Sequence, residues 1–302
     1  MSPDLSKFRG STVALITPFN KDFSVDEIGL RRLVDWHIEQ GTDVLLACGT
    51  TGESATLSHK EHHRVIDIVA EHAAGRVPVI AGAGSNSTAE AVSLTEHASK
   101  SGADAILSVG PYYNKPTQQG FYEHFKTVAE ATDKPIILYN VPGRTASNIC
   151  GDTTLKLAEL ANIIGVKEAS GNMSQIMNIL SNRPADFLVL SGDDALSLAL
   201  LALGVDGVIS VVANQVPGLF RDMVHSALDG DWHKARELHY KLLPLMEFNF
   251  CESNPTPVKT ACAMMGLVEE VVRLPLMPLT STNKERMKML LDELGLLPSS
   301  AD

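Results

Sequence analysis

The sequence predicts an α/β fold, a (β/α)8 TIM barrel with a helical appendage at its C-terminal end. Eight short runs of aliphatic and β-branched residues recur, with starts 20 to 35 residues apart between positions 13 and 208. Stretches with helical spacing separate these runs. The runs are apolar on both faces, as expected for strands of a parallel sheet covered by helices. Eight β-then-α units over about 225 residues approach the roughly 250 residues typical of a barrel.

The predicted strands, in order, are VALIT from Val13, VLLAC from Val44, VIAGAG from Val79, AILSVGP from Ala105, IILYNVP from Ile136, IIGVKEAS from Ile163, LVLSGDD from Leu188 and VISVVAN from Val208. The first intervening helix is marked by Leu30, Leu33 and Val34 at helical spacing, with Gly41 as its expected C-cap. A doubly wound open sheet uses the same unit and is the alternative architecture, but the strand count favours the barrel.

No strand-like run of comparable quality follows Ala213. Residues 224–246, 257–267 and 284–297 have helical spacing and predict three helices. We therefore expect a catalytic barrel over residues 1–223 and a helical region over residues 224–302 that packs on it. No low-complexity linker separates the two.

Composition excludes several classes of protein. The chain has 302 residues, 44% of them hydrophobic and 20% charged, which predicts a globular fold rather than disorder. With 25 Lys and Arg against 36 Asp and Glu, the net charge of −11 and the absence of a basic run argue against nucleic acid as a partner. The longest apolar run, residues 195–205, is well short of the roughly 20 residues that span a membrane. With no secretory signal and no CxxC pair, we expect a cytoplasmic protein without a disulfide scaffold or zinc site.

The ends of the predicted strands carry the candidate chemistry, because barrel enzymes build their active sites there. Lys167 stands out, since it closes an otherwise apolar strand. Burial favours the neutral amine of a lysine, and a neutral amine can attack a ketone to form a Schiff base. The alternative is that Lys167 reaches solvent or pairs with Glu168.

Hydroxyl groups and one arginine accompany Lys167 at these strand ends. Thr50, Tyr113 and Tyr139 could relay protons, although tyrosines at strand ends also often only pack their rings. Arg144 could clamp a carboxylate through its guanidinium, or could simply be solvated. Thr50 and Thr51, flanked by glycines, offer hydroxyls and backbone N–H groups that suit a small carboxylate.

Three rival motifs are weaker. Gly82 and Gly84 follow a predicted strand in an incomplete GxGxxG pattern, which leaves a dinucleotide oxidoreductase as an alternative. His59 and His63 are four residues apart but match no metal-binding motif. The acidic pair at positions 193 and 194 suits the start of a helix better than a cation site. We therefore predict no metal.

Six motifs, taken together, resemble one known family. They are GTTGES from Gly49, PYYNKP from Pro111, YNVPGRT from Tyr139, GVKEASGN from Gly165, SGDD from Ser191 and GVISV from Gly207. In this order they resemble the 4-hydroxy-tetrahydrodipicolinate (dihydrodipicolinate) synthase family of the N-acetylneuraminate lyase superfamily, from about Ser11 into the C-terminal helices. The resemblance implies a lyase of lysine and diaminopimelate biosynthesis that condenses pyruvate, as a Schiff base on Lys167, with L-aspartate 4-semialdehyde. It implies no metal and no organic cofactor.

The resemblance also implies roles for individual residues. Tyr139 would donate and accept protons, and Thr50 would link it to Tyr113, which would reach into the site of a neighbouring subunit. The implied substrate-binding residues are Thr51 and the backbone of Ile209 for pyruvate, Arg144 for the carboxylate of the semialdehyde, and Gly192. Members of the family commonly form homotetramers, as dimers of dimers, so a homotetramer is expected.

A second site follows from the same resemblance. In members inhibited by L-lysine, the effector pocket matches Ser54, Ala55, His59, His62, Asn86, Glu90 and Tyr112. Glu90 would bind the effector's ammonium group, and Tyr112 would couple the pocket to Tyr113. The alternative is that His59 and His62 only decorate a helix.

Two further functions remain open besides the oxidoreductase. One is a pyruvate-dependent aldolase of the same superfamily that acts on sialic acid or a 2-keto-3-deoxy sugar acid. Arg144 favours the synthase, because those aldolases generally lack an arginine at this place. The other is a catalytically silent metabolite-binding protein, against which the presence of Lys167, Tyr139, Thr50 and Tyr113 argues.

Overall fold

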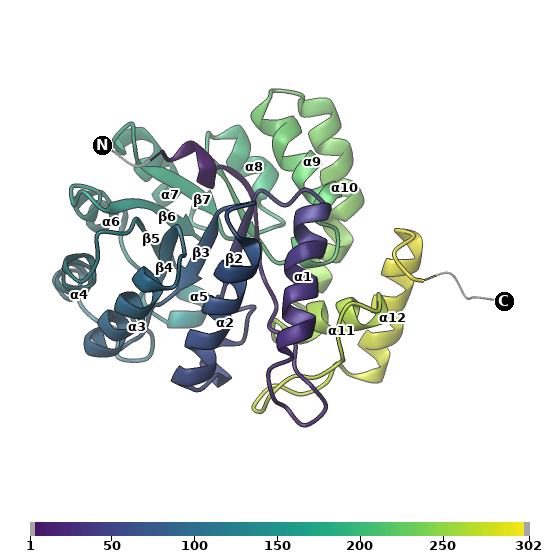
Figure 1. The fold of residues 1–302 in the computed structure, drawn as a ribbon. Helices are drawn as coiled ribbons and strands as arrows, with labels where there is room; N and C mark the ends of the chain where they lie inside the picture. The colour runs from purple at the N-terminus through teal and green to yellow at the C-terminus, as the bar shows by residue number, and fades with distance from the viewer. Residues whose placement is uncertain (1–3, 299–302) are drawn as a thin grey trace.

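The computed structural model describes residues 4–298 and shows a closed barrel of eight parallel strands (Figure 1). The strands are β1 (Gly10–Ala14), β2 (Val44–Ala47), β3 (Val79–Gly82), β4 (Ala105–Val109), β5 (Ile136–Asn140), β6 (Ile163–Glu168), β7 (Leu188–Ser191) and β8 (Gly207–Ser210). They pair in chain order, and β8 closes the barrel on β1 with Gly207 opposite Gly10. This closing pair confirms the predicted barrel and excludes the open sheet.

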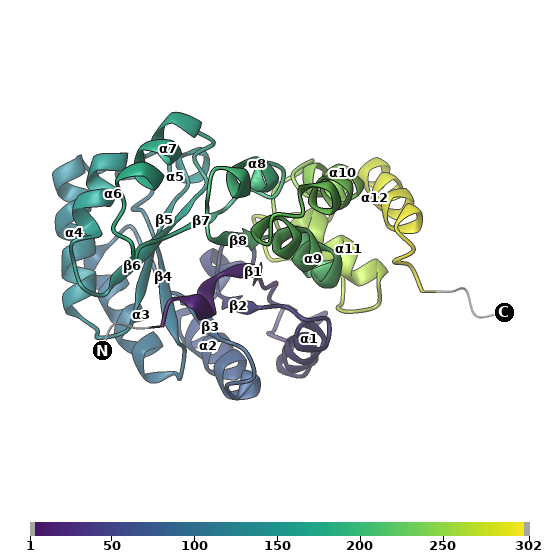
Figure 2. The same cartoon turned by 90° about the horizontal axis from the view of Figure 1, so that it is seen from above.

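Helices cover the outside of the barrel between successive strands (Figure 2). They are α1 (Glu27–Glu39), α2 (His59–Ala73), α3 (Thr88–Lys100), α4 (Gln118–Glu130), α5 (Pro142–Thr145), α6 (Gly151–Leu157), α7 (Met173–Asn182), α8 (Ser197–Ala202) and α9 (Pro217–Leu228). Within residues 4–298 there are also three short 3-10 helices: η1 (Ser6–Phe8) before β1, η2 (Ser54–Thr56) after β2 and η3 (Val212–Asn214) after β8.

Two hydrophobic clusters explain why the strands are apolar on both faces. In β5, Ile137 and Tyr139 point into the barrel and join the interior cluster with Leu190 and Ile209. The alternate residues of that strand, such as Ile136, join the larger cluster between the barrel and its helices. Side chains alternate between the two faces of a strand, so a strand buried on both sides reads as a continuous apolar run.

The C-terminal region differs from the prediction in one respect. The single helix predicted over residues 224–246 is wrong, because the chain forms α9 and then α10 (Trp232–Phe248). Gly230, at a φ of 84°, makes the break, and the side chain of Asp231 caps α10 by accepting from the Lys234 N–H. The predicted boundary after residue 223 falls within α9, and the division into two regions stays a prediction.

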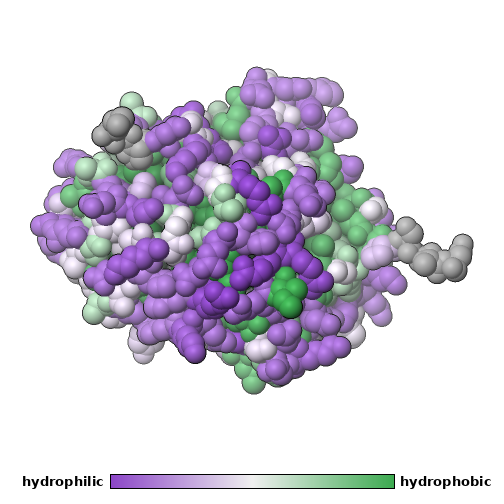
Figure 3. Space-filling view, in the orientation of Figure 1, coloured by the Kyte–Doolittle hydropathy of each residue, from purple (hydrophilic) through white to green (hydrophobic). Residues whose placement is uncertain are grey.

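The other two C-terminal helices are α11 (Thr256–Met264) and α12 (Ser281–Glu293), close to their predicted positions. Helices α9 and α10 pack side by side, with α11 and α12 beyond them (Figures 1 and 2). The face seen in Figure 3 is predominantly hydrophilic with scattered apolar residues. Within residues 4–298, no helix combines the length and apolar character that a bilayer crossing would require.

Candidate active site

Lys167 and Tyr139 lie side by side at the carboxyl ends of adjacent strands. They are register partners in β6 and β5, and both point into the barrel. The Lys167 Nζ lies 4.2 Å from the centroid of the Tyr139 ring, and each residue is only 6% exposed. The pair therefore places an amine and a phenol in one enclosed space.

Glu168 does not pair with Lys167. As the next residue of β6 it points to the opposite face, where its carboxylate accepts from Asn140 Nδ2, Gln175 Nε2 and the Ser170 N–H. In the part of the chain that the structure describes, no acidic oxygen lies within 4.0 Å of the Lys167 amine, so the alternative of a Lys167–Glu168 pair is wrong. Among the described residues the Lys167 amine therefore has no acidic partner.

A cavity of about 130 Å³ opens at this mouth of the barrel. It is lined by Ala14, Leu46, Thr50, Thr51, Tyr139, Val141, Arg144, Lys167, Ala169, Gly192, Asp193, Val211, Phe250 and Asn254. The structure thus brings together six of the eight expected catalytic and substrate-binding residues. The volume suits a molecule of a few non-hydrogen atoms.

The remaining two expected residues lie elsewhere. Ile209 is buried in the barrel interior and does not line the cavity, whereas Val211, two residues further on, does. Tyr113 is 89% exposed and adopts a φ of 69°, a conformation strained for a residue with a side chain. The chain's own fold leaves the Tyr113 ring on the surface.

Gly192 leaves room for the Lys167 side chain. A Cβ at this position would lie 2.8 Å from Lys167 Cε and 2.7 Å from the Ala169 Cβ, closer than real carbon atoms approach. The absence of a side chain at Gly192 therefore sets the path by which the lysine reaches the cavity.

The turn that carries Thr50 and Thr51 is tightly held between β2 and η2. Cys48 and Glu53 bracket it, each at a φ of 54°. A Cβ on Gly52 would lie 3.0 Å from the Leu15 carbonyl oxygen, so the turn packs directly on the neighbouring backbone. Backbone strain such as the positive φ of Cys48 and Glu53 is found where the surrounding structure holds a functional loop in one conformation.

The sequence patterns do not point to Phe250 and Asn254, which line the cavity from the segment after α10. Asn254 is 5% exposed, and its Nδ2 donates to Thr51 Oγ1 at 3.0 Å. The rule that barrel enzymes build their active sites at the carboxyl ends of the strands (the strand-end rule) concerns only the barrel. It therefore does not point to residues of a later helical region. The Asn254-Pro255 dipeptide signals a turn, but not which part of the molecule that turn covers.

A second cavity, of about 440 Å³, adjoins the first. It is lined by Thr50, Ser54, Ala55, Leu57, His59, His62, Gly84, Glu90, Leu94, Val109, Tyr112, Val141, Arg144 and Thr145. Six of the seven expected effector residues are among these. Asn86 is not, and its carbonyl oxygen accepts from Asn114 Nδ2 at 2.8 Å. Thr50, Val141 and Arg144 line both cavities.

The second cavity contains an ionised acid. Glu90 accepts hydrogen bonds from Ser85 and from His59 Nε2, the latter at 2.7 Å, and these bonds hold the pKa of Glu90 below its usual value. Burial lowers the pKa of His62 to about 4, so that ring is neutral at pH 7. A carboxylate beside a hydroxyl group and the neutral ring of His62 suits a ligand with an ammonium group.

The rival motifs have structural explanations. A Cβ on Gly82 would lie 2.3 Å from the Cys48 carbonyl oxygen, and one on Gly84 would lie 2.3 Å from the Val109 nitrogen, so close packing of strands requires both glycines. His63 stacks on His97 with ring centroids 3.8 Å apart. Over residues 4–298, no three His, Cys, Asp or Glu side chains cluster closely enough to hold a metal ion.

A (β/α)8 barrel with a buried lysine beside a tyrosine at its carboxyl end has the architecture of an aldolase-type lyase. Comparison with known proteins gives the family. The model of the dihydrodipicolinate synthetase family matches residues 7–294, and the chain belongs to this family.

Named relatives agree with this assignment. A 4-hydroxy-tetrahydrodipicolinate synthase of Chloroherpeton thalassium is 55% identical over 293 residues, which cover 97% of each chain. The crystal structure of dihydrodipicolinate synthase from Aquifex aeolicus is 50% identical, covers 97% of this chain and 100% of its own, and superposes with a TM-score of 0.95.

Two other solved members contain small molecules. The enzyme from Acinetobacter baumannii complexed with pyruvate is 46% identical, with a TM-score of 0.94 and coverage of 96% of this chain and 99% of its own. The enzyme from Cyanidioschyzon merolae with lysine bound is 40% identical, with the same TM-score and the same coverage.

Proposed function

We propose that the protein condenses pyruvate with L-aspartate 4-semialdehyde through a Schiff base on Lys167, in lysine and diaminopimelate biosynthesis. The observation that carries the proposal is the Lys167 amine, buried beside Tyr139 in a small cavity and unpaired with any described acid. The named relatives and the pyruvate-containing structure from Acinetobacter baumannii support the choice of substrates.

The reaction begins with attack of the Lys167 amine on the ketone carbon of pyruvate, which forms a carbinolamine and then, with loss of water, an iminium ion. Loss of a methyl proton gives an enamine, whose carbon attacks the aldehyde carbon of the semialdehyde. The amino group of the semialdehyde then closes the ring on the former ketone carbon and releases the lysine. Tyr139 and Thr50, both at the cavity, move the protons that these steps require.

Arg144 is the proposed partner of the semialdehyde's carboxylate. It lines both cavities and lies in the short helix α5, so its guanidinium can meet a substrate that enters over the Lys167 adduct. A planar guanidinium binds a carboxylate through two parallel hydrogen bonds. Thr51 and the backbone of Ile209 are the proposed contacts of pyruvate, and Gly192 is a further proposed substrate-binding residue. Of these, Thr51 and Gly192 line the Lys167 cavity.

Tyr113 is the proposed contribution of one subunit to the site of another. Its ring is almost fully exposed, and its backbone is held in the strained conformation by a hydrogen bond from the Tyr113 N–H to the Thr145 carbonyl oxygen. A large aromatic side chain held out in this way suits an interface between copies of the chain. We therefore propose a dimer as the active unit and a homotetramer as the assembly.

L-Lysine is the proposed inhibitor, bound in the second cavity with its ammonium on Glu90. The support is the ionised Glu90, the cavity's position next to Thr50 and Arg144, and the lysine-bound relative from Cyanidioschyzon merolae. Replacing Glu90 by Ala should relieve inhibition by lysine and spare turnover. The matched control is Glu96→Ala, an exposed glutamate on the same helix, which should leave inhibition unchanged.

Borohydride reduction in the presence of pyruvate tests the proposal directly. The wild-type protein should gain the mass of one reduced pyruvate adduct per chain, and Lys167→Ala should gain none. Turnover assays should then show consumption of pyruvate with L-aspartate 4-semialdehyde and not with N-acetylmannosamine. A preference for the sugar would be consistent with the Schiff base but would overturn the biosynthetic role. An adduct that persists in Lys167→Ala would show that Lys167 is not the residue that forms the Schiff base.

A further inference from the structure

The turn that carries Thr50 and Thr51 is anchored by the C-terminal region, more than 200 residues away in the sequence. Lys259 Nζ donates to Glu53 Oε1 at 2.6 Å, and the two side chains are 1% and 0% exposed. The other Glu53 oxygen accepts from the Arg273 N–H at 3.1 Å. Burial lowers the pKa of Lys259 to about 8, although the carboxylate of Glu53 acts in the opposite direction, so the lysine is charged at pH 7.

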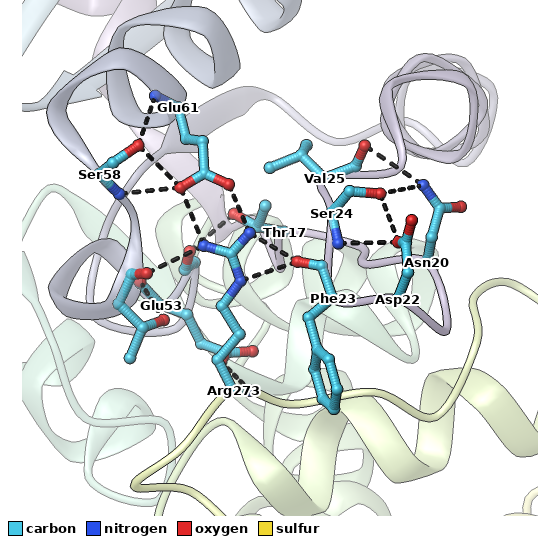
Figure 4. A network of polar contacts seen from close by, with 12 residues as sticks. Thr17, Asn20, Asp22, Phe23, Ser24, Val25, Glu53, Ser58, Glu61 and Arg273 are labelled. Carbon is cyan, nitrogen blue, oxygen red and sulfur yellow. Dashed lines mark hydrogen bonds and ion pairs between the residues drawn. The ribbon is translucent and has the colours of Figure 1, made fainter.

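The Arg273 guanidinium extends this network to the loop before α1, to η2 and to the first turn of α2 (Figure 4). It donates to the carbonyl oxygens of Phe23 and Thr56 and to both carboxylate oxygens of Glu61. The ring of Phe19 lies near both cations, with Lys259 Nζ 4.1 Å and Arg273 Cζ 4.3 Å from its centroid. These contacts hold the left-handed Glu53, and with it one end of the turn, in a single position.

At the catalytic end of the same turn, Asn254 contacts Thr51. The Asn254 Nδ2 donates to Thr51 Oγ1 at 3.0 Å, and both residues are at least 95% buried at the wall of the Lys167 cavity. Over residues 4–298 this is the one hydrogen bond of the Asn254 amide, because its Oδ1 is buried without a partner. Among the described residues, the Asn254 amide therefore hydrogen-bonds only to Thr51.

A hydroxyl donates one hydrogen bond and accepts two. Because Asn254 occupies an acceptor position on Thr51 Oγ1, the hydroxyl's own proton is not used by the amide. Among the described residues no other group accepts that proton. It can therefore donate to an anion in the cavity, and a carboxylate is the strongest acceptor that such a donor can meet.

We propose that Asn254 is a positioning residue for the carboxylate of the keto acid, because it aims the Thr51 hydroxyl as a donor into the Lys167 cavity. This inference rests on the proposed function, since it takes pyruvate as the molecule in the cavity. The C-terminal region then contributes to substrate binding as well as to packing.

A double-mutant cycle on Asn254→Ala and Thr51→Val tests the inference through the KM for pyruvate. Each single variant should raise this KM about tenfold, the value of one hydrogen bond to a charged group, while the KM for the semialdehyde changes little. The double variant should be no worse than either single variant, since both remove the same interaction. The inference would be overturned if the increase in KM of the double variant equalled the product of the two single increases. An unchanged KM for pyruvate in Asn254→Ala would also overturn it.

Asn249→Ala is the matched control, because Asn249 is also a buried amide at the end of α10 but pairs with Gln215 instead. It should lower the melting temperature and leave the KM for pyruvate unchanged. If the control raised this KM equally, the effect of Asn254 would be structural and the inference would fail. If wild-type protein formed no borohydride-reduced adduct with pyruvate, the proposed function itself would fail, which is a separate outcome.

Discussion

A methyl group added at Gly192 should displace the reactive lysine. The Cβ of Gly192→Ala would lie 2.8 Å from Lys167 Cε and 3.2 Å from Lys167 Cγ, against the 3.5–4.0 Å at which carbon atoms pack. The lysine stem must therefore move by about 1 Å, because the other neighbour, the Cβ of Ala169 at 2.7 Å, belongs to the β6 end and cannot yield freely.

The size of the effect follows from this displacement. A misplacement of about 1 Å at a reacting group costs on the order of 100-fold in rate. Overpacking of this kind also costs about 1–3 kcal/mol of stability. We therefore expect Gly192→Ala to fold with a lowered melting temperature and to lose about 100-fold in kcat.

The assay compares the rate of borohydride trapping with pyruvate, the kcat and the melting temperature. Gly143→Ala is the matched control, because Gly143 lies in α5 at the same mouth of the barrel and a Cβ there would meet nothing within 4 Å. The control should match the wild type in all three measurements. A Gly192→Ala protein that forms the pyruvate adduct and turns over at wild-type rates would refute the reasoning.

Two further predictions concern buried polar groups. Replacing Glu168 by Ala should lower the free energy of unfolding by about 3 kcal/mol, because buried donors of Asn140 and Gln175 lose their acceptor, yet Lys167 should still form the pyruvate adduct below the melting temperature. Loss of the adduct in a folded variant would show that Glu168 acts on the lysine. Separately, burial lowers the pKa of His37 to about 3 and those of His62 and His124 to about 4, so the unfolded chain binds more protons below pH 6.5. Stability should fall as pH drops from 6.5 toward 4, by about 2 kcal/mol per buried histidine between pH 6.5 and 5, as chemical denaturation measures. Asp194, whose pKa burial raises to about 6, opposes this trend, and a stability that rose on acidification would contradict the prediction.

Local sequence patterns predicted the barrel well because strands and helices depend on nearby residues. All eight apolar runs form strands, and Lys167 is the next-to-last residue of β6, close to the strand end where its place after an apolar run suggested. The prediction of a single helix over residues 224–246 was wrong for a local reason. Gly230 ends one helix and Asp231 caps the next, and both residue types can be read from the sequence. The helical spacing of apolar residues on both sides of Gly230 had suggested one continuous helix.

The candidate site was predicted only where the strand-end rule applied. That rule, with the family resemblance, gave Lys167, Tyr139 and Arg144, which the structure brings to one cavity. It did not point to Phe250 or Asn254, which come from outside the barrel.

The sequence by itself therefore determined which segments form strands and helices and the position of a lysine near a strand end. These depend on interactions between neighbours in the chain, which composition and spacing record. Tertiary structure decided that Glu53 pairs with Lys259, that Asn254 meets Thr51, and that Gly192 must lack a side chain. Such contacts join residues that chain spacing cannot relate, because only the closed barrel and the helices packed on it bring them within bonding distance.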